Sequence, residues 1–196
     1  MSKVINTKQK ILKSAYKFFT RNGFSGTSMS MIASDAIVTQ SLIHHHFKDK
    51  HKLWHAVKEE YVGKKYPGLI LEFDHFKTIA EALDYYITLR FNFYLDNPEM
   101  VKLVSWQRLE STPETLLAKD AYDGKIKLID FIRKQQKLGK VSLKLDAESV
   151  VRFIHPAISS VILDCPMKLK KDTKRIQKLL YNIKRIIING VLNFEN

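Results

Sequence analysis

The chain has 196 residues, with 33 Lys and Arg against 20 Asp and Glu and a formal net charge of +13 at pH 7. One Cys excludes an intrachain disulfide and a zinc cage of cysteines, and 7 Gly with 5 Pro leave long uninterrupted segments that can bury a core. No apolar run reaches the roughly 18 residues that cross a bilayer, and no signal-peptide core opens the chain. We therefore expect a cytoplasmic protein with no membrane partner.

The first predicted element is an amphipathic helix over residues 7–22. Gly23 follows its last residue, in the position where glycine ends many helices. Its inward side chains recur at helical spacing, namely Ile11, Leu12, Ala15, Phe18 and Phe19.

Residues 27–50 predict two short helices joined by a tight turn. Ser28 and Thr39 stand where N-caps belong. Only three residues follow Ala36 before the second helix, which leaves no room for a long loop. The inward positions are Ile32, Ala33, Ala36, Val38, Ile43 and Phe47, and the second helix leaves outward Gln40, Ser41, His44 and His45. Such a pair is a helix-turn-helix, whose second helix can enter a DNA groove.

The remaining sequence is helical in period and is divided by Pro and Gly. We predict a helix over 50–65 and further helices near 76–96, 99–111, 113–138, 147–164 and 172–193. The expected fold is all-α: a three-helix head with the helix-turn-helix (residues 1–49), a connecting helix (50–66) and a helical-bundle body (67–196).

Positive charge gathers beside the helix-turn-helix. Residues 1–65 hold 12 Lys and Arg against 4 Asp and Glu, whereas the other 131 residues hold 21 against 16. Lysine and arginine near the helix pair favour double-stranded DNA as a partner, because they neutralise phosphates. We expect no enzyme, since the sequence has no GxSxG, HExxH, CxxC or Walker motif.

About 50 N-terminal residues resemble the DNA-binding domain of the tetracycline-repressor (TetR) family of transcriptional regulators. The residues that carry the resemblance are Ile11-Leu12 through Phe19, Asn22-Gly23-Phe24, Thr27-Ser28, Ile32-Ala33, Val38-Thr39, His45-His46-Phe47-Lys48, Lys50 and Leu53. The resemblance implies a homodimeric repressor that leaves a palindromic operator when an unknown small-molecule effector binds its body. A DNA-binding dimer without a ligand, acting in chromosome organisation, is the alternative.

The resemblance also implies roles for individual residues of the helix-turn-helix. Thr27, Ser28, Thr39, His45 and Lys50 would contact the phosphate backbone, and Ser41 lies on the same outer face. Gln40 is the expected base reader, because its amide can make a bidentate contact with adenine; Leu42 and His44 are the next candidates.

Ile37 stands where the family usually has the glycine of the turn. A β-branched residue there is strained if its φ is positive. His44 replaces a usual tyrosine. His51 and His55, at i and i+4, could hold zinc, but no Cys or carboxylate completes a set, so we predict no metal and no cofactor.

In the body, the apolar side chains of the last predicted helix cover a wider arc than the side that can face the core of its own chain. We expect a two-fold dimer through this helix and the one near 147–164. Large aromatic residues with polar tips predict an effector pocket, lined by Tyr86, Phe91, Tyr94, Trp106, Phe131, Phe153 and His155; for any one of them, filling the core is the simpler reading.

Overall fold

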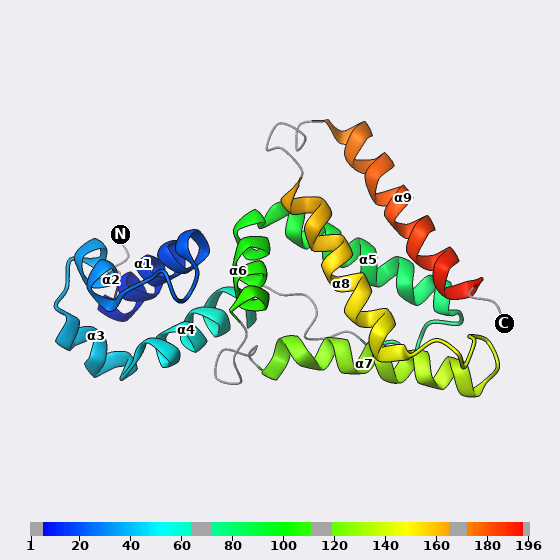
Figure 1. The fold of residues 1–196 in the computed structure, drawn as a ribbon, viewed down its shortest axis with the longest axis horizontal. Helices are drawn as coiled ribbons and strands as arrows, with labels where there is room; N and C mark the ends of the chain where they lie inside the picture. The colour runs from blue at the N-terminus through cyan, green and yellow to red at the C-terminus, as the bar shows by residue number, and fades with distance from the viewer. Residues whose placement is uncertain (1–5, 64–71, 111–118, 165–171, 194–196) are drawn as a thin grey trace. The chain divides into compact units, whose positions relative to one another are not determined.

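The computed structural model describes residues 6–63, 72–110, 119–164 and 172–193 (Figure 1). Within these ranges it has helices and no β-strand, which confirms the predicted all-α fold. The helices are α1 (Thr7–Asn22), α2 (Met29–Ala36), α3 (Gln40–Phe47), α4 (Lys50–Lys58), a π-helix η1 (Glu59–Gly63), α5 (Ile79–Asp96), α6 (Pro98–Leu109), α7 (Lys119–Lys137), α8 (Ala147–Leu163) and α9 (Thr173–Leu192).

The contacts divide the chain into two compact units. The head unit contains α1 to α4 together with α6, and the body unit contains α5, most of α7, α8 and α9. The head unit therefore includes one helix, α6, that follows α5 in the sequence. Within the described ranges, none of the helices is both long enough and apolar enough to cross a membrane.

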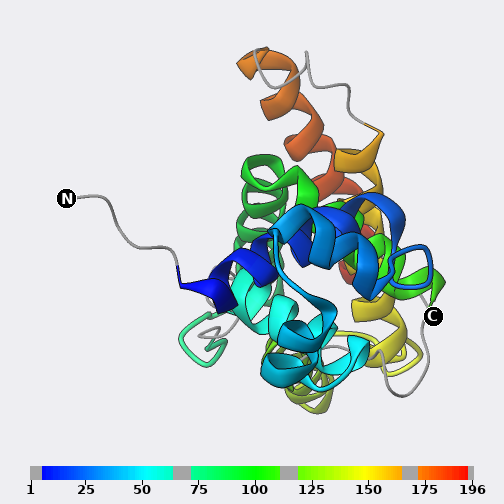
Figure 2. The same ribbon diagram turned by 90° about the vertical axis from the view of Figure 1, so that its left-hand side faces the viewer.

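Aromatic and branched side chains from four helices form the core of the head unit, which faces the viewer in Figure 2. The Phe19 ring meets the Trp54 ring edge to face at 4.9 Å between centroids. Burying such a side chain stabilises the fold by about 1.5–3 kcal/mol. The fully buried members are Ile11, Phe19, Ile32, Ile43, Leu53, Trp54 and Val57.

Each of the three short helices begins at a side chain that caps it. The Ser28 hydroxyl accepts from the Met31 amide at 3.2 Å, and the Thr39 hydroxyl accepts from the Leu42 amide at 3.2 Å. Both predicted caps are thus confirmed. Asp49 caps α4 through the amide of Lys52 at 2.7 Å. These bonds satisfy amides that a helix leaves open at its first turn.

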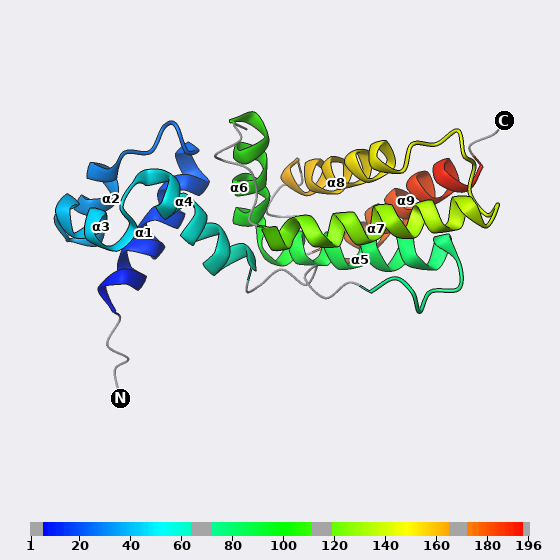
Figure 3. The same cartoon turned by 90° about the horizontal axis from the view of Figure 1, so that it is seen from below.

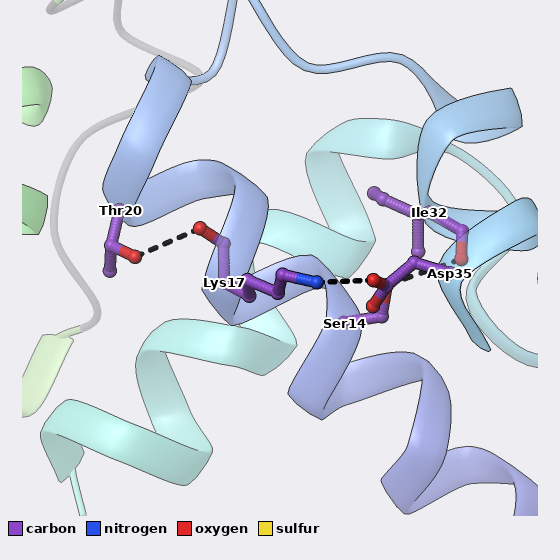
Figure 4. Close-up of polar contacts among 5 residues, drawn as sticks. All are labelled: Ser14, Lys17, Thr20, Ile32 and Asp35. Atoms are coloured by element: carbon purple, nitrogen blue, oxygen red, sulfur yellow. Dashed lines mark hydrogen bonds and ion pairs between the residues drawn. The ribbon is translucent and has the colours of Figure 1, made fainter.

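Polar contacts fix α2 against α1 (Figure 4). The buried Ser14 hydroxyl donates to the carbonyl of Ile32 at 3.2 Å, and the Lys17 ammonium pairs with the carboxylate of Asp35. The hydrogen bonds from Lys17 and Ser14 lower the pKa of Asp35. The helix-turn-helix is therefore held on α1 by polar contacts as well as by its core.

The body unit is organised around α5, which packs against α8 and α9 (Figure 3). Helix α5 begins at a complete capping box: Thr78 Oγ1 accepts from the Glu81 amide at 3.1 Å, and Glu81 accepts from the Thr78 amide at 3.3 Å. This cap places the start of α5 three residues after the predicted residue 76. The predicted start of the helix at 113 lies outside the described residues.

Candidate nucleic-acid interface

One face of α3 is free of the head core. Ile43 and Phe47 are buried, whereas the side chains of Gln40, Ser41, His44 and His45 are exposed, and Leu42 is half-buried. We call Gln40, Ser41, His44 and His45 the recognition face. Its spacing of one and four residues follows the helical period, as predicted. The face offers an amide, a hydroxyl and two imidazoles, which can donate to and accept from base edges and phosphates.

Two exposed hydroxyls cap the two helices of the helix-turn-helix. Ser28 is exposed and its Oγ lies 2.8 Å from Ser30 Oγ; Thr39 is exposed and its Oγ1 lies 2.9 Å from Ser41 Oγ. Each hydroxyl pair stands at the first turn of a helix, where open amides and the helix dipole favour an anion. Both hydroxyls are exposed where a phosphate could reach them, and their predicted phosphate contacts stay predictions.

Thr27 occupies a different place from the one predicted. Its side chain is 1% exposed, and its hydroxyl donates to the carbonyl of Gly23 at 2.7 Å. A hydroxyl that is buried and already donating holds the loop between α1 and α2. The Thr27 side chain therefore has almost no exposed surface with which it could make the predicted phosphate contact.

Lys50 is also directed into the head unit. Its Nζ donates to the carbonyls of Phe24 and Thr27, both at 3.0 Å, and lies 4.3 Å from the centre of the Phe24 ring. Partial burial lowers the pKa of this ammonium, and the charge of Glu110 opposes that shift. Lys50 therefore holds the same loop that Thr27 holds.

The turns on either side of α3 contain two residues with positive φ. Ile37 has φ 55° and ψ 53°; its amide donates to Ser34 and the Val38 amide donates to Ala33, which is the Schellman pattern at the end of α2. The positive φ on which the predicted strain at Ile37 depends is therefore present. Lys48 has φ 65° and ψ −53°, and the Asp49 amide donates to Phe47 across it at 2.8 Å, a strained γ-turn.

The γ-turn also orients His44. Its Nδ1 lies 2.8 Å from the carbonyl of Lys48, and because a carbonyl only accepts, Nδ1 carries the proton. This contact fixes the orientation of the exposed His44 ring. His44 thus presents one defined edge on the recognition face.

Five of the seven predicted pocket residues are buried in the body unit. Tyr86 and Tyr94 lie near His155, at 6.4 and 6.3 Å between ring centroids. Sequence reasoning missed Arg90, which lies between Tyr86 and Tyr94 in the sequence. Its side chain is buried, and the guanidinium carbon lies 4.9 Å from the centre of the Tyr86 ring. Burial lowers the pKa of Arg90 to about 9. The other two buried residues of the predicted set are Phe91 and Phe131.

The remaining two predicted pocket residues lie elsewhere. Phe153 is 63% exposed, because the helical period of α8 turns it away from buried Val151 and Ile154. Trp106 belongs to the head unit, with its ring against Gly23. A cavity of about 360 Å³ in the body unit includes one of the predicted pocket residues, Phe131, but has mostly charged walls, formed by Glu72, Phe73, Asp74, Lys127, Asp130, Phe131 and Lys134.

Family models match both parts of the chain. Residues 11–57 match the model of bacterial regulatory proteins of the tetR family, and residues 82–178 match that of the tetracyclin repressor-like C-terminal domain. The first match contains the helix-turn-helix with its recognition face. The second contains α6, α7 and α8 complete, with most of α5.

Individual relatives agree with the two models. The transcriptional regulator RutR of Escherichia coli K12 is 26% identical over 202 residues, which cover 97% of this chain and 93% of RutR. The regulator YttP of Bacillus subtilis is 45% identical over 60 residues, which span only 29% of its own length.

Solved structures share the fold. The hemolysin II transcriptional regulator HlyIIR has a TM-score of 0.67 at 21% identity and covers 95% of this chain and 97% of its own. The fatty acid degradation regulator FadR of Bacillus halodurans has a TM-score of 0.66 at 15% identity, covering 96% and 98%.

Proposed function

The chain belongs to the tetR family of bacterial regulatory proteins and is a DNA-binding transcriptional regulator, and we propose that it is a repressor of this kind. In this proposal a homodimer binds a palindromic operator and leaves it when a small molecule binds the body unit. The observation that carries the proposal is the recognition face: four exposed polar side chains on a helix whose other side is buried in the head core.

Gln40 is the residue that we expect to read sequence. It is the first residue of α3, it is exposed, and it lies between the capping hydroxyl of Thr39 and Ser41. A glutamine amide can donate to N7 of adenine and accept from its amino group. For Gln40 to do so, the amino-terminal end of α3 must face the major groove. The two hydroxyls beside it suit the neighbouring phosphate, which fixes the register of the helix.

A two-fold dimer through α8 and α9 would account for the apolar surface of the body unit. Helix α9 buries Ile183, Ile187 and Val191, yet Ile186 is 69% exposed. Exposed apolar residues gathered on two neighbouring helices favour a protein interface. The others on these helices are Phe153, Leu163, Tyr181 and Leu192. Two heads in such a dimer would reach half-sites about 34 Å apart, one helical turn of DNA.

The interior of the body unit supports a small-molecule effector with a polar group. The Tyr86 hydroxyl is fully buried and has no hydrogen-bond partner among the residues that the structure describes. Burial raises its pKa well above the usual value, so it stays a donor. His155 and the Arg90 guanidinium lie beside the same ring. A ligand that accepts a hydrogen bond would satisfy this hydroxyl, and a coupling of about 1–3 kcal/mol would suffice to release DNA.

Footprinting on DNA upstream of the chain's own gene, followed by binding to the protected duplex, tests the proposal. Gln40→Ala should weaken binding to that duplex by about 5- to 150-fold, the equivalent of 1–3 kcal/mol, and leave binding to unrelated DNA unchanged. Gln177→Ala, the same substitution at an exposed site on α9, is the control. Equal losses on both duplexes, or salt-independent binding by the wild type, would contradict the proposed function.

A further inference from the structure

Charged side chains from two helices hold the loop between α1 and α2. Glu110, just after α6, accepts from the Phe24 amide at 2.6 Å and from the Ser25 amide at 3.2 Å. From the other side, Lys50 at the start of α4 donates to the carbonyls of Phe24 and Thr27. The loop's amides thus meet a carboxylate and its carbonyls meet an ammonium. We call Glu110, Lys50 and the loop backbone the loop clasp.

The sequence of the loop is fitted to the approach of α6. Gly23 has φ 75° and ψ −178°, a conformation that suits glycine. A Cβ placed on Gly23 would lie 2.8 Å from Glu110 Oε1 and 2.8 Å from Trp106 Cε3. A Cβ essentially never lies so close to another heavy atom, so any side chain at residue 23 would displace Glu110 and Trp106 from these positions. The contact therefore depends on residues more than 80 positions apart.

The clasp ends where the predicted phosphate contact begins. Thr27 is its last residue, and Ser28 caps α2 immediately afterwards. A hydrogen bond to a charged acceptor is among the stronger ones, and here two such bonds and two from the ammonium hold three residues, Phe24, Ser25 and Thr27. The direction of the first turn of α2, with its open amides and the Ser28 hydroxyl, is set by this loop.

We propose that Glu110 is a positioning residue for DNA binding, acting through the loop backbone on the amino-terminal end of α2. The inference rests on the proposed function, because it concerns the same DNA contact. Glu110 does not touch DNA in this account. It holds Phe24 and Ser25 so that Ser28 meets a phosphate while α3 lies in the groove.

Electrostatics alone predicts the opposite effect, which makes the proposal easy to test. Removing an acid from a basic head should strengthen binding to any duplex, since it reduces repulsion of phosphates. Positioning predicts that Glu110→Ala weakens binding to the operator, and we expect a loss of about tenfold. Glu99→Ala, which removes an exposed acid at the other end of the same helix, is the matched control and should bind as well as the wild type or more tightly.

Three variants of the full-length protein should be compared on the footprinted duplex at two salt concentrations, with amide exchange measured at Phe24 and Ser25. Glu110→Ala should speed exchange at both amides and weaken operator binding. Glu110→Gln, which keeps one oxygen as acceptor, should restore most of the affinity. Gly23→Ala should weaken binding without any change in charge, because its Cβ displaces Glu110 and Trp106.

The outcomes separate the inference from the proposed function. Operator binding by Glu110→Ala equal to or tighter than that of the wild type, with unchanged exchange, would overturn the positioning role and leave the proposed function standing. Operator binding by Gly23→Ala equal to that of the wild type would overturn it as well. If Glu110→Ala melts far below the wild type, the Gln variant decides: slow exchange at Phe24 and Ser25 together with near wild-type affinity supports the role, and full affinity with fast exchange refutes it. A wild type that protects no duplex would contradict the proposed function itself.

Discussion

Ile37, in the turn between α2 and α3, adopts a left-handed conformation, and we expect Ile37→Gly to stabilise the head unit. That conformation costs an L-residue about 1–2 kcal/mol, whereas glycine adopts it freely. Glycine gives back about 0.5–1 kcal/mol through the greater entropy of its unfolded chain. Since Ile37 is 90% exposed, the substitution removes almost no buried surface. The net gain should be about 1 kcal/mol.

Tryptophan fluorescence during urea denaturation measures this gain in the right part of the chain. Both tryptophans, Trp54 and Trp106, belong to the head unit. For a chain of this size, 1 kcal/mol should also raise the melting temperature by about 2–4 °C. Operator affinity should stay within about twofold, because the turn keeps its Schellman bonds.

Ile37→Ala separates backbone strain from the loss of an exposed apolar side chain. Alanine keeps the penalty for a positive φ, so its effect should be smaller than that of glycine. If alanine stabilised the head unit as much as glycine, or if glycine destabilised it, the strain argument for Ile37 would be refuted.

Three further predictions concern burial, association and capping. Lys58 is fully buried and burial lowers its pKa to about 8, so the native state holds an unfavourable charge below that pH and loses it above, while the unfolded amine stays protonated to about pH 10. Urea titrations should therefore find that the wild type gains roughly 1–2 kcal/mol of stability relative to Lys58→Met between pH 7 and pH 9.5; a difference independent of pH would contradict it. Ile186→Glu should give a monomer in sedimentation equilibrium with weakened operator binding, and an intact dimer would argue against the α8 and α9 interface. Thr78→Ala breaks the capping box of α5 and should cost about 1 kcal/mol in thermal unfolding followed by circular dichroism; no change in melting would mean that the cap contributes nothing.

The helices of the head could be predicted from sequence because their signals are local. The apolar spacing of α1, the caps at Ser28 and Thr39 and the glycine after Asn22 all lie within a few residues of the feature that they specify. The exposed stripe of α3 follows in the same way from the helical period, since Ile43 and Phe47 must face the core. The possible strain at Ile37 was identified differently, through the resemblance to the TetR family, which usually has a glycine at that position.

Contacts between distant residues could not be predicted in this way. Nothing near Lys50 indicates that its ammonium turns to the carbonyls of Phe24 and Thr27 instead of outward. Glu110 lies 86 residues from the amide it binds, and no periodicity links them. In the body, aromatic composition identified Tyr86 and His155 as interior but also included Phe153, because composition does not register which side of α8 a residue occupies.

The membership of α6 in the head unit bears on how such proteins can be recombined. A fragment or graft that ends at residue 66 would contain the whole helix-turn-helix but would lack Trp106 and Glu110, which contact the loop at Gly23 and Phe24. The continuous segment that contains the helix-turn-helix therefore has different boundaries from the head unit, which also includes α6. A chimera that joins this head to a foreign body should keep its operator preference only if the foreign helix supplies an acid and an aromatic ring at the matching positions.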